Sequence, residues 1–391
     1  MHVLMIACRY ETGGAPRSMK EMILRLSEKH GVMFTIALSK EGNLSKWCRE
    51  NSIDYIISNH RTFAEPKEKN LMRQMRNKAV AIIRNKQAVN IIEKSIDMKS
   101  ISLIHTNSNR DCLGALLSKK YNIPHVWHLR EYGKQDYDVH FYFPFTVSFM
   151  NKNTKRFIAI SQSVESAWKR QGLAPSKMVQ IYNGVNTSSI IHKNYKKHKQ
   201  IRIVFTGSII ESKGQLESIR ALSLLEKDVR EHFIIDFFFE SAEPEYKQQI
   251  DKVVQEYNLD CLVNFCGSTN DIGKILHNYD VGITCSKSEA FGRVTVEYMA
   301  AGLITIASNT GANPEIIEDG ENGFLYEYGN PESLSRILEK IYYIDVNEKQ
   351  QIGQAAIERV EQNFTDKINA KNVYELYLDI LKNRRNKSDV T

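Results

Sequence analysis

Short apolar runs alternate with amphipathic stretches along almost the whole chain. The runs are rich in Val, Ile, Leu and Phe without alternation of polar and apolar positions, which is typical of parallel strands buried on both faces. We therefore expect strands, in chain order, at His2–Cys8, Val32–Leu38, Ile53–Ile57, Ile101–Thr106, His125–Leu129, Phe157–Ile160, Ile201–Thr206, Phe233–Phe239, Val263–Cys266, Val281–Cys285, Ile304–Ala307 and Gly323–Tyr326.

The stretches between these runs are amphipathic and predict helices. Alternation of strand and helix in this order indicates doubly wound parallel sheets and hence an α/β fold. The expected helices are Ser18–Lys29, Asp111–Lys120, Gln162–Gln171, Gly214–Leu225, Glu245–Tyr257, Arg293–Ala301 and Pro331–Ile341.

The strand–helix pattern occurs as two series, separated by the polar and basic segment Asn186–Gln200. We therefore predict two Rossmann-like domains, an N-terminal one at residues 1–185 and a C-terminal one at residues 186–365. A last amphipathic helix, expected at Asp366–Leu381, closes the N-terminal domain, and a polar, frayed tail follows it. Because each domain has its own sheet, we expect a ligand cleft between the facing carboxyl ends of the two sets of strands.

The composition is that of a soluble globular protein. The chain has 391 residues, 42% of them hydrophobic and 25% charged, and this length favours two domains over one. Its cysteines are scattered without a CxxC pair, which argues against a disulfide framework or a zinc site. The apolar run at the N-terminus is too short for a signal peptide, and no apolar stretch reaches the roughly 18 residues of a membrane-spanning helix. We expect a cytoplasmic protein.

The chain has a formal net charge of +7, and its basic residues are concentrated in one region. The region Arg61–Lys99 carries many more basic than acidic residues, and Leu71, Met75, Ala79 and Ile82 recur within it at helical spacing. A basic amphipathic helix of this kind can dock on an anionic membrane surface. It can equally be a solvated helix whose apolar face lies in the core. Nucleic-acid binding is a third interpretation, but no recognisable binding module accompanies the charge.

A glycine turn follows the first expected strand, in the segment Arg9–Arg17 (RYETGGAPR). Gly13 and Gly14 can adopt backbone conformations that let the chain approach a ligand closely, and the following helix offers free N–H groups to a phosphate or a sugar. The segment is not GxGxxG, so it lacks the dinucleotide-binding fingerprint. The alternative is a simple tight turn between a strand and a helix.

A second turn, Thr206–Gly214 (TGSIIESKG), follows the first strand of the second half. The strand ends at Gly207 and a helix opens near Lys213, so the loop can hold a cation over phosphate groups. Lysine is a suitable point charge for a diphosphate. A lysine near a helix start can also be merely solvated.

The most informative segment is Ser286–Gly302 (SKSEAFGRVTVEYMAAG), which contains a loop and a helix start. Glu289 lies on the loop, and Glu297 lies in the first turns of the helix. Carboxylates can accept hydrogen bonds from the hydroxyls of a sugar and a ribose, and the helix N-terminus offers amide donors to a phosphate. A Glu-x7-Glu spacing alone arises readily by chance, and Glu297 can be only a partner of the helix dipole. The surrounding pattern of AFG and small residues makes the segment specific.

This segment resembles the Glu-x7-Glu motif of the family-4 retaining glycosyltransferases of GT-B fold (glycosyl transferases group 1). Other segments fit the family's order. IYNGVN resembles its domain junction, TGSIIESKG its strand–Gly-Arg–loop–Lys-Gly segment, and TGANPEIIEDGENGFLY its Gly-x-Pro-Glu and Asn-Gly-x-Leu segment. HVWHLREYG (His125–Gly133) resembles the stretch with the active-site histidine in members of capsule type. The resemblance runs from about residue 3 to residue 340 and implies two Rossmann-like domains facing an interdomain cleft.

The resemblance implies a role for each motif residue. Glu289 would bind hydroxyls of the donor sugar, Glu297 the ribose, and Lys213 the diphosphate. His128 would lie by the transferred sugar, near its 6-position, so His128, Glu289 and Lys213 are the expected catalytic residues. Gly14 would lie against the donor phosphate. The expected donor-binding residues also include Gly13, Gly14, Gly207, Ser208, Ala290, Phe291, Gly292 and Arg293.

The resemblance also implies the chemistry. The sugar leaves and is attacked on the same face, and the leaving phosphate accepts the proton of the acceptor. Stabilising the departing diphosphate is then the dominant catalytic effect, and a lysine with a helix N-terminus can supply it without a metal or another cofactor. A nucleotide-sugar donor is implied, with a UDP-sugar as the default.

For the acceptor we expect a glycan or a lipid-linked glycan of surface-polysaccharide biosynthesis. Asn107, Arg130 and Glu131 are the expected acceptor contacts. A lipid-linked acceptor would suit a peripheral position on the inner face of the cell membrane.

One position departs from the family, which usually has an arginine directly after the glycine of the first C-domain strand. Here that position is Ser208, so one cation for the diphosphate is missing from its usual place. Arg293, at the helix start, is a candidate to replace it.

Two other functions stay open. A nucleotide-sugar epimerase of the same fold would use a similar diphosphate site without a second substrate. A non-catalytic glycosyltransferase-like partner subunit is favoured by Ser208, whereas Glu289, Glu297 and Lys213 argue against it.

Overall fold

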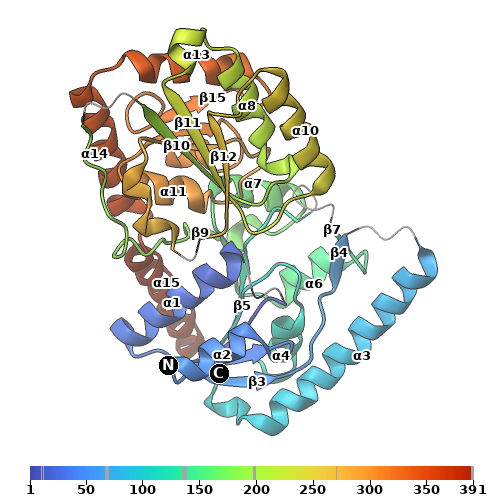
Figure 1. Cartoon of the computed structure of the whole chain (residues 1–391). Helices are drawn as coiled ribbons and strands as arrows, with labels where there is room; N and C mark the ends of the chain where they lie inside the picture. The colour runs from blue at the N-terminus through green and yellow to red at the C-terminus, as the bar shows by residue number, and fades with distance from the viewer. Residues whose placement is uncertain are drawn as a thin grey trace. The chain divides into compact units, whose positions relative to one another are not determined.

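The computed structural model describes residues 1–9, 11, 13–66, 70–133, 139–196, 200–269 and 271–388 (Figure 1). The chain divides into two compact units. Unit 1 is Met1–Gly184 together with Asp366–Thr391, and unit 2 is Val185–Thr365. Each unit has its own sheet and its own hydrophobic core.

The sheet of unit 1 has seven parallel strands in the order β3-β2-β1-β5-β6-β8-β9. Successive residues of β1 contact opposite faces, since Met5 belongs to one core cluster and Leu4 and Ile6 to another. Both faces are therefore buried, which explains the uninterrupted apolar runs. The strands are β1 (His2–Ile6), β2 (Met33–Leu38), β3 (Asp54–Ile57), β5 (Leu103–Thr106), β6 (His125–Leu129), β8 (Arg156–Ala159) and β9 (Met178–Gln180); β4 (Ala64–Pro66) and β7 (Val139–Phe141) form a separate antiparallel pair.

Helices cover both faces of this sheet (Figure 1). On one face, α1 (Gly14–His30) and α15 (Asp366–Ser388) lie side by side and share a core cluster with β1. An ion pair of 2.7 Å between Arg25 and Asp366 holds the start of α15 against α1. The remaining helices of unit 1 are α2 (Asn43–Glu50), α3 (Leu71–Ser95), α4 (Leu113–Tyr121), α6 (Thr146–Lys152) and α7 (Gln162–Arg170), of which α3 and α4 cover the other face.

The sheet of unit 2 has six parallel strands in the order β12-β11-β10-β13-β14-β15. Ile203 of β10 faces the core cluster shared with α8, α10 and α13, whereas Val204 faces the cluster around Tyr298 of α11. The elements are β10 (Ile201–Thr206), β11 (Phe233–Phe238), β12 (Val263–Gly267), β13 (Val281–Thr284), β14 (Ile304–Ser308), β15 (Phe324–Tyr326), α8 (Gln215–Ser223), α9 (Lys227–Arg230), α10 (Pro244–Glu256), α11 (Arg293–Ala300), α12 (Asn313–Ile316), α13 (Pro331–Tyr343) and α14 (Val346–Asn363).

The two doubly wound parallel sheets confirm the expected α/β fold. Every expected strand is present, with bounds that shift by a few residues. The apolar pattern did not reveal the three-residue strands β4, β7 and β9, or the helices α2, α6 and α14. The last helix continues to Ser388, past the expected end at Leu381. None of the described helices is long and apolar enough to cross a membrane.

Candidate functional site

Each sheet has a topological switch point, a pair of adjacent strands from which the strand order continues toward opposite edges of the sheet. In unit 2 it lies between β10 and β13, because β11 and β12 extend the sheet on one side and β14 and β15 on the other. In unit 1 it lies between β1 and β5. The loops at the carboxyl ends of such strand pairs are the usual ligand-binding positions of open parallel sheets. The candidate residues gather after these strands.

At the switch point of unit 2, Lys213 meets Glu289. Lys213 Nζ lies 2.5 Å from Glu289 Oε1, and Ser286 Oγ donates to the same oxygen at 2.7 Å. Burial opposes ionisation of this carboxyl group, but the Lys213 ammonium and the Ser286 hydroxyl outweigh it and lower the Glu289 pKa. The Lys213 and Glu289 side chains keep 34% and 18% of their surface exposed. The pair is therefore charged and accessible to a ligand.

Two glycines allow this meeting. Gly214 has φ +72°, and a Cβ there would lie 2.3 Å from the carbonyl oxygen of Cys285, at the end of β13. Gly207 has φ +149°, and the Lys213 side chain passes over it, since a Cβ there would lie 3.9 Å from Lys213 Cδ. Both positions require a residue without a side chain. The close approach lets the loop after β10 bring Lys213 to the loop after β13.

The N-terminus of α11 belongs to the same site. Gly292 has φ +81° and is the N-cap residue of the helix, so it contributes no side-chain cap. Arg293 Nε donates to Glu297 Oε1 at 3.1 Å, one turn further along, and Glu297 is buried. Phe291 is also buried, and its ring packs edge-on against Phe364. A ligand could therefore contact the backbone of this segment but not the Phe291 ring. Ala290 is half-buried between Glu289 and Phe291.

The end of β14 and the loop after it hold the Glu289 loop through hydrogen bonds to its backbone carbonyl oxygens. Ser308 Oγ and Thr310 Oγ1 donate to the carbonyl oxygen of Ser286 at 2.7 and 2.8 Å. Ala312 donates its backbone N–H to the Glu289 carbonyl oxygen at 2.8 Å. Sequence reasoning assigned no role to these residues individually, although Thr310 and Ala312 lie in the TGANPE segment. Their contact with Glu289 depends on strand order, which no local pattern reveals.

Ser208 is half-buried and hydrogen-bonded. Its hydroxyl accepts from Ser241 Oγ at 3.0 Å, and its carbonyl oxygen accepts from Gln215 Nε2 at 2.8 Å. The position therefore supplies a neutral hydroxyl where the family usually has a guanidinium.

In unit 1, His128 is fully buried at the carboxyl end of β6. Its Nδ1 lies 3.1 Å from Nε2 of His105, on the adjacent β5, and His105 Nδ1 is hydrogen-bonded to the hydroxyl of Tyr377, on α15. Burial lowers the pKa of both histidines, and the positive charge of Arg130 lowers both further. The two rings are therefore neutral at physiological pH.

The predicted acceptor residues directly follow β5 and β6, the strands that carry this pair. Arg130 donates from Nε and Nη2 to Asn107 Oδ1 at 3.0 and 2.8 Å, and from Nη1 to Asn183. Arg130 and Asn107 are both buried. Glu131 is half-buried and forms an ion pair of 2.8 Å with Arg110. Asn107 and Arg130 thus hold the strand ends together, whereas Glu131 is the most accessible of the three.

The glycine turn of unit 1 is open. Gly13 has φ +95° and precedes α1, and both Gly13 and Gly14 are exposed. Among the described residues, leaving out the chain neighbours of each glycine, no heavy atom lies within 4 Å of a Cβ built on either. Tyr10 and Thr12 of the same motif lie outside the described residues. A 17-residue helix with an open glycine start can receive an anion.

Two family models match adjoining parts of the chain. Glycosyltransferase Family 4 matches residues 12–189, and Glycosyl transferases group 1 matches residues 186–359. The chain belongs to the family-4 glycosyltransferases.

Known proteins with similar sequence or structure agree with this assignment. An uncharacterized glycosyltransferase of Methanocaldococcus jannaschii is 27% identical over 75% of this chain and 81% of its own length. The capsular polysaccharide biosynthesis glycosyltransferase CapM of Staphylococcus aureus is 22% identical over 59% of this chain and 63% of CapM. The structure of Anabaena HepE in complex with UDP is similar with a TM-score of 0.78 at 19% identity, over 97% of this chain and 99% of HepE. The last likeness confirms the GT-B type of fold.

The basic helix α3 of this glycosyltransferase has two apolar faces. Its C-terminal half packs on the rest of unit 1 through Ala88 and Ile92. The apolar positions that the sequence singled out lie elsewhere, on an exposed stripe at helical spacing. This α3 stripe consists of Leu71, Met72, Met75, Ala79, Ile82 and Ile83, of which Leu71, Met72, Met75, Ile82 and Ile83 are 67%, 83%, 64%, 51% and 56% exposed.

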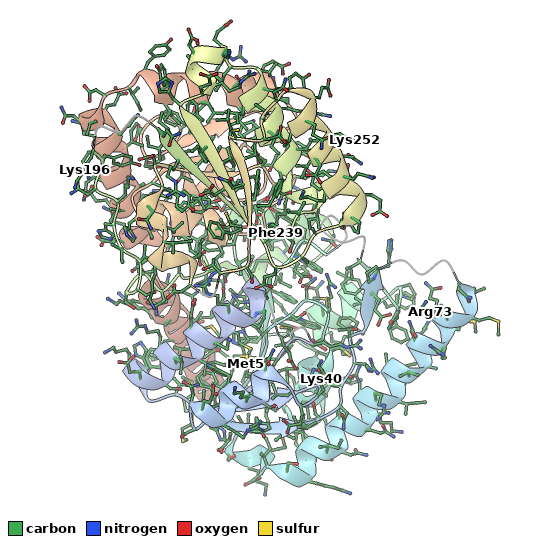
Figure 2. All side chains as sticks on the ribbon, in the orientation of Figure 1. Met5, Lys40, Arg73, Lys196, Phe239 and Lys252 are labelled. Carbon is green, nitrogen blue, oxygen red and sulfur yellow. The ribbon has the colours of Figure 1, made fainter. Side chains whose placement is uncertain are left out.

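The interpretation that the α3 stripe lies in the core is therefore wrong. Figures 1 and 2 show the N-terminal half of α3, with Arg73 labelled, extending past the sheet of unit 1. Between residues 71 and 92 the helix carries no acidic residue. Lys67 and Lys69, which belong to the predicted basic region, lie outside the described residues.

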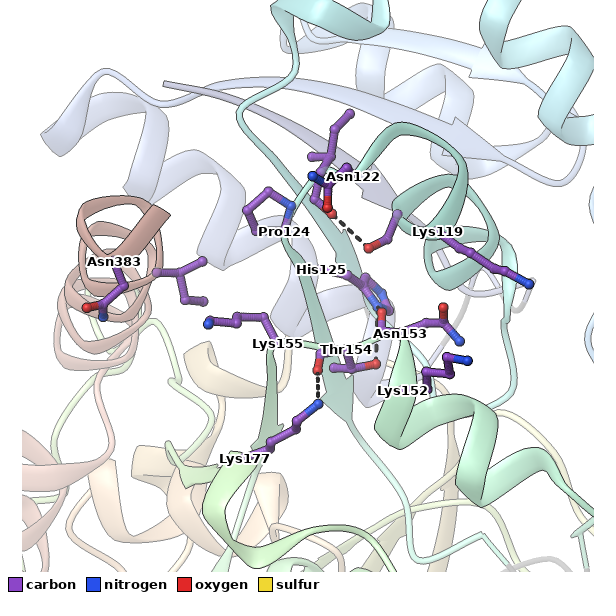
Figure 3. A pocket seen from close by; sticks show the side chains of 13 residues that line it. Lys119, Asn122, Pro124, His125, Lys152, Asn153, Thr154, Lys155, Lys177 and Asn383 are labelled. Carbon is purple, nitrogen blue, oxygen red and sulfur yellow. Dashed lines mark hydrogen bonds between the residues drawn. The ribbon is translucent and has the colours of Figure 1, made fainter. Parts of the chain in front are cut away.

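A cavity of about 760 Å³ opens in unit 1 at the amino end of β6, and none of the predicted site residues lines it (Figure 3). Lys177 Nζ donates to the carbonyl oxygen of Thr154 at 2.9 Å. Lys119 and Lys152 lie in the last turns of α4 and α6, where cations stabilise the helix dipole. Lys119, Lys152 and Lys177 thus have a structural explanation.

The described residues contain no group of three or more His, Cys, Asp or Glu side chains that could hold a metal ion. Two cationic side chains of the protein pair with the motif carboxylates, Lys213 with Glu289 and Arg293 with Glu297.

Proposed function

We propose that this glycosyltransferase transfers a hexose-type sugar from a UDP-sugar to a glycan or lipid-linked acceptor in surface-polysaccharide biosynthesis, with retention of configuration. The observation that carries the proposal is the meeting of Lys213, Glu289 and the N-terminus of α11 at the switch point of unit 2. A cation, a carboxylate and helix amides at one sheet edge are the groups that a sugar diphosphate requires. The UDP bound to HepE and the role of CapM in capsular polysaccharide biosynthesis support the choice of donor and pathway.

In this proposal Lys213 binds the diphosphate and Glu289 accepts hydrogen bonds from hydroxyls of the donor sugar. An ammonium group has three N–H donors, so Lys213 can keep its contact with Glu289 and also contact phosphate oxygens. Glu297, one helix turn beyond Arg293, accepts from the ribose. Backbone N–H groups in the first turn of α11 complete the phosphate contacts.

The transfer step needs no base from the protein. The bond between C1 of the sugar and the diphosphate oxygen breaks, and the acceptor oxygen bonds to C1 on the same face. The acceptor proton passes to the leaving phosphate. Lys213 and the α11 amides stabilise the negative charge that develops on the diphosphate, and we propose that they do so without a metal.

Arg293 supplies the second positive charge in this proposal, in place of the arginine that Ser208 replaces. A guanidinium group has five N–H donors, so the bond from Arg293 Nε to Glu297 is compatible with a contact to phosphate. Arg293→Ala should weaken donor binding. Unchanged donor binding and turnover in this variant would discard the role.

A screen of nucleotide sugars that follows the released nucleoside diphosphate tests the proposal. We expect release from a UDP-sugar in the presence of a glycan acceptor, and NMR of the product should show that the anomeric configuration is retained. Epimerisation of the donor without an acceptor would instead identify an epimerase. No turnover with any donor, combined with no binding of nucleoside diphosphates, would identify a non-catalytic subunit.

We further propose that unit 1 docks on an anionic membrane through the α3 stripe, which would bring the enzyme to a lipid-linked acceptor. The stripe offers apolar side chains to the acyl boundary, and basic residues of the same helix, including Arg73, Arg76 and Arg84, offer positive charge to anionic headgroups. Exposed apolar side chains gathered on one helix face are unusual for a surface that meets only water.

Co-sedimentation with vesicles of phosphatidylcholine, alone or mixed with phosphatidylglycerol, tests the membrane proposal. We expect binding to the anionic vesicles that weakens with salt and is lost when Met75 and Ile82 are both changed to Ser. The control Met33→Ser, at a position 59% exposed on β2, should bind normally. Absence of binding at every salt concentration would contradict the proposal, as would a stripe variant that altered only self-association.

A further inference from the structure

Three buried groups of unit 1 form a chain that ends at His128. Tyr377 on α15 is hydrogen-bonded to Nδ1 of His105, and Nε2 of His105 lies 3.1 Å from Nδ1 of His128. All three side chains are fully buried. Within the part of the chain that the structure describes, Nε2 of His128 has no hydrogen-bond partner. A buried polar atom without a partner calls for an explanation, and a bound substrate is one.

The number of protons in this chain is fixed. Burial lowers the pKa of His105 and His128, so each imidazole carries one N–H rather than two. Burial raises the pKa of Tyr377, so the phenol keeps its proton. Three hydrogens are therefore shared along three groups, and each of the two internal hydrogen bonds uses one of them. The direction of the first bond decides the direction of the second.

The phenol proton sets that direction. Among the described residues, His105 is the hydrogen-bonding partner of the Tyr377 hydroxyl. If Tyr377 donates, His105 accepts at Nδ1 and carries its hydrogen on Nε2. His105 then donates to Nδ1 of His128, which leaves the hydrogen of His128 on Nε2. Among the described residues, this direction leaves one buried donor without an acceptor, the Nε2–H of His128. If the bonds ran the other way, two buried groups would lack a partner, the phenol O–H and the unprotonated Nε2 of His128, which is the costlier arrangement.

We propose that Tyr377 and His105 are positioning residues that hold His128 as a neutral Nε2–H donor. In this tautomer His128 offers a hydrogen bond to an oxygen of the substrate and cannot act as a base through the same atom. The inference rests on the proposed function for the identity of that oxygen, which would be a hydroxyl of the transferred sugar. It also gives the C-terminal helix α15 a role in the site, because α15 supplies the first donor of the chain.

The tautomers can be observed directly in the full chain by long-range ¹H–¹⁵N NMR of protein labelled with ¹⁵N-histidine, without substrate. His128 is assigned by the loss of its signals in His128→Gln. We expect wild-type His128 and His105 each to show the Nε2–H tautomer. An Nδ1–H tautomer of His128 would overturn the proposal whether or not the enzyme transfers sugars, so this outcome is distinct from failure of the proposed function.

Variants sharpen the test. Tyr377→Phe removes the first donor, and the single Nε2–H tautomer of His128 should be lost in favour of a mixture. Tyr374→Phe, on the same helix but in contact with His30, is the matched control and should leave the tautomer unchanged. His105→Gln retains a donor near His128, whereas His105→Leu does not, so only the former should preserve the tautomer. An unchanged His128 spectrum in folded Tyr377→Phe and His105→Leu would overturn the relay.

Discussion

The two units hold their candidate residues in different electrostatic states. In unit 2 the residues are charged and form two ion pairs, Lys213–Glu289 and Arg293–Glu297. In unit 1 the catalytic candidate His128 and its neighbour His105 are neutral imidazole rings in a buried network of hydrogen bonds. The difference follows from pairing, because Glu289 and Glu297 each have a cationic partner, whereas the charge of Arg130 disfavours a second positive charge on either imidazole.

Each state suits a different task. The loops of unit 2 leave Lys213 and Glu289 partly exposed, so a charged diphosphate can reach a charged pair. The strands of unit 1 fix the direction of hydrogen bonds and exclude a change of charge near neutral pH. We therefore expect variants of unit 2 to affect charge stabilisation and variants of unit 1 to affect orientation.

The largest expected effect is that of Lys213→Ala on turnover. Loss of the cation nearest Glu289 should reduce turnover on the order of 10²–10³-fold, as loss of one preorganised group that stabilises a developing charge commonly does. The measurement is initial release of nucleoside diphosphate. Lys287→Ala, which removes an exposed lysine from the same loop region, is the control and should be nearly normal. Equal rates for the two variants would contradict the role of Lys213.

The next effect concerns the glycine that brings the two loops together. Gly214→Ala should destabilise unit 2 more than Gly267→Ala, in thermal and denaturant unfolding. Both glycines have left-handed backbone, φ +72° and +70°, so both substitutions cost about 1–2 kcal/mol in conformation. Only at Gly214 would the new Cβ overlap a backbone carbonyl, that of Cys285 at 2.3 Å. Similar unfolding free energies for both variants would show that the loops do not depend on this close approach.

A smaller effect should appear in the dependence of stability on pH. The Glu289 pKa is lowered in the folded chain, so the charged carboxylate stabilises the fold above its unfolded pKa, and this contribution is lost as the pH falls through the folded pKa. The unfolding free energy of wild type relative to Glu289→Gln should therefore be highest at neutral pH and fall below pH of about 4. A difference that is constant from pH 7 to pH 3 would argue against an ionised, paired Glu289.

The smallest expected effect is that of metal removal. Because Lys213 and the amides of α11 supply the positive charge, excess EDTA should leave the initial rate unchanged. A rate that fell with EDTA and recovered with Mg²⁺ or Mn²⁺ would show that a metal takes part.

Much of the fold could be predicted because its strands are buried on both faces. Predominantly apolar runs such as Ile201–Thr206 then indicate strands from local sequence alone, without knowledge of the tertiary structure. The strand β9 has only three residues, and α14 begins with a polar run, so neither gives a clear local pattern. The α3 stripe shows a further limit, since its helical spacing fits a core face as well as an exposed one.

The candidate site could be predicted in part for a related reason. Lys213 and Glu289 each follow a strand, so their meeting follows from strand order together with the family resemblance. The pairing of His105 with Tyr377 could not be predicted, because the two residues are separated by 272 positions. A contact of that separation depends on the return of α15 to unit 1, which no local pattern encodes.

The central claim is that Lys213 binds the diphosphate of the donor. Calorimetric titration of the full chain with UDP tests it without an acceptor and without turnover. We expect measurable affinity for wild type and Lys287→Ala and a marked loss of affinity for a folded Lys213→Ala. Equal UDP affinity in all three proteins would show that Lys213 does not bind the diphosphate.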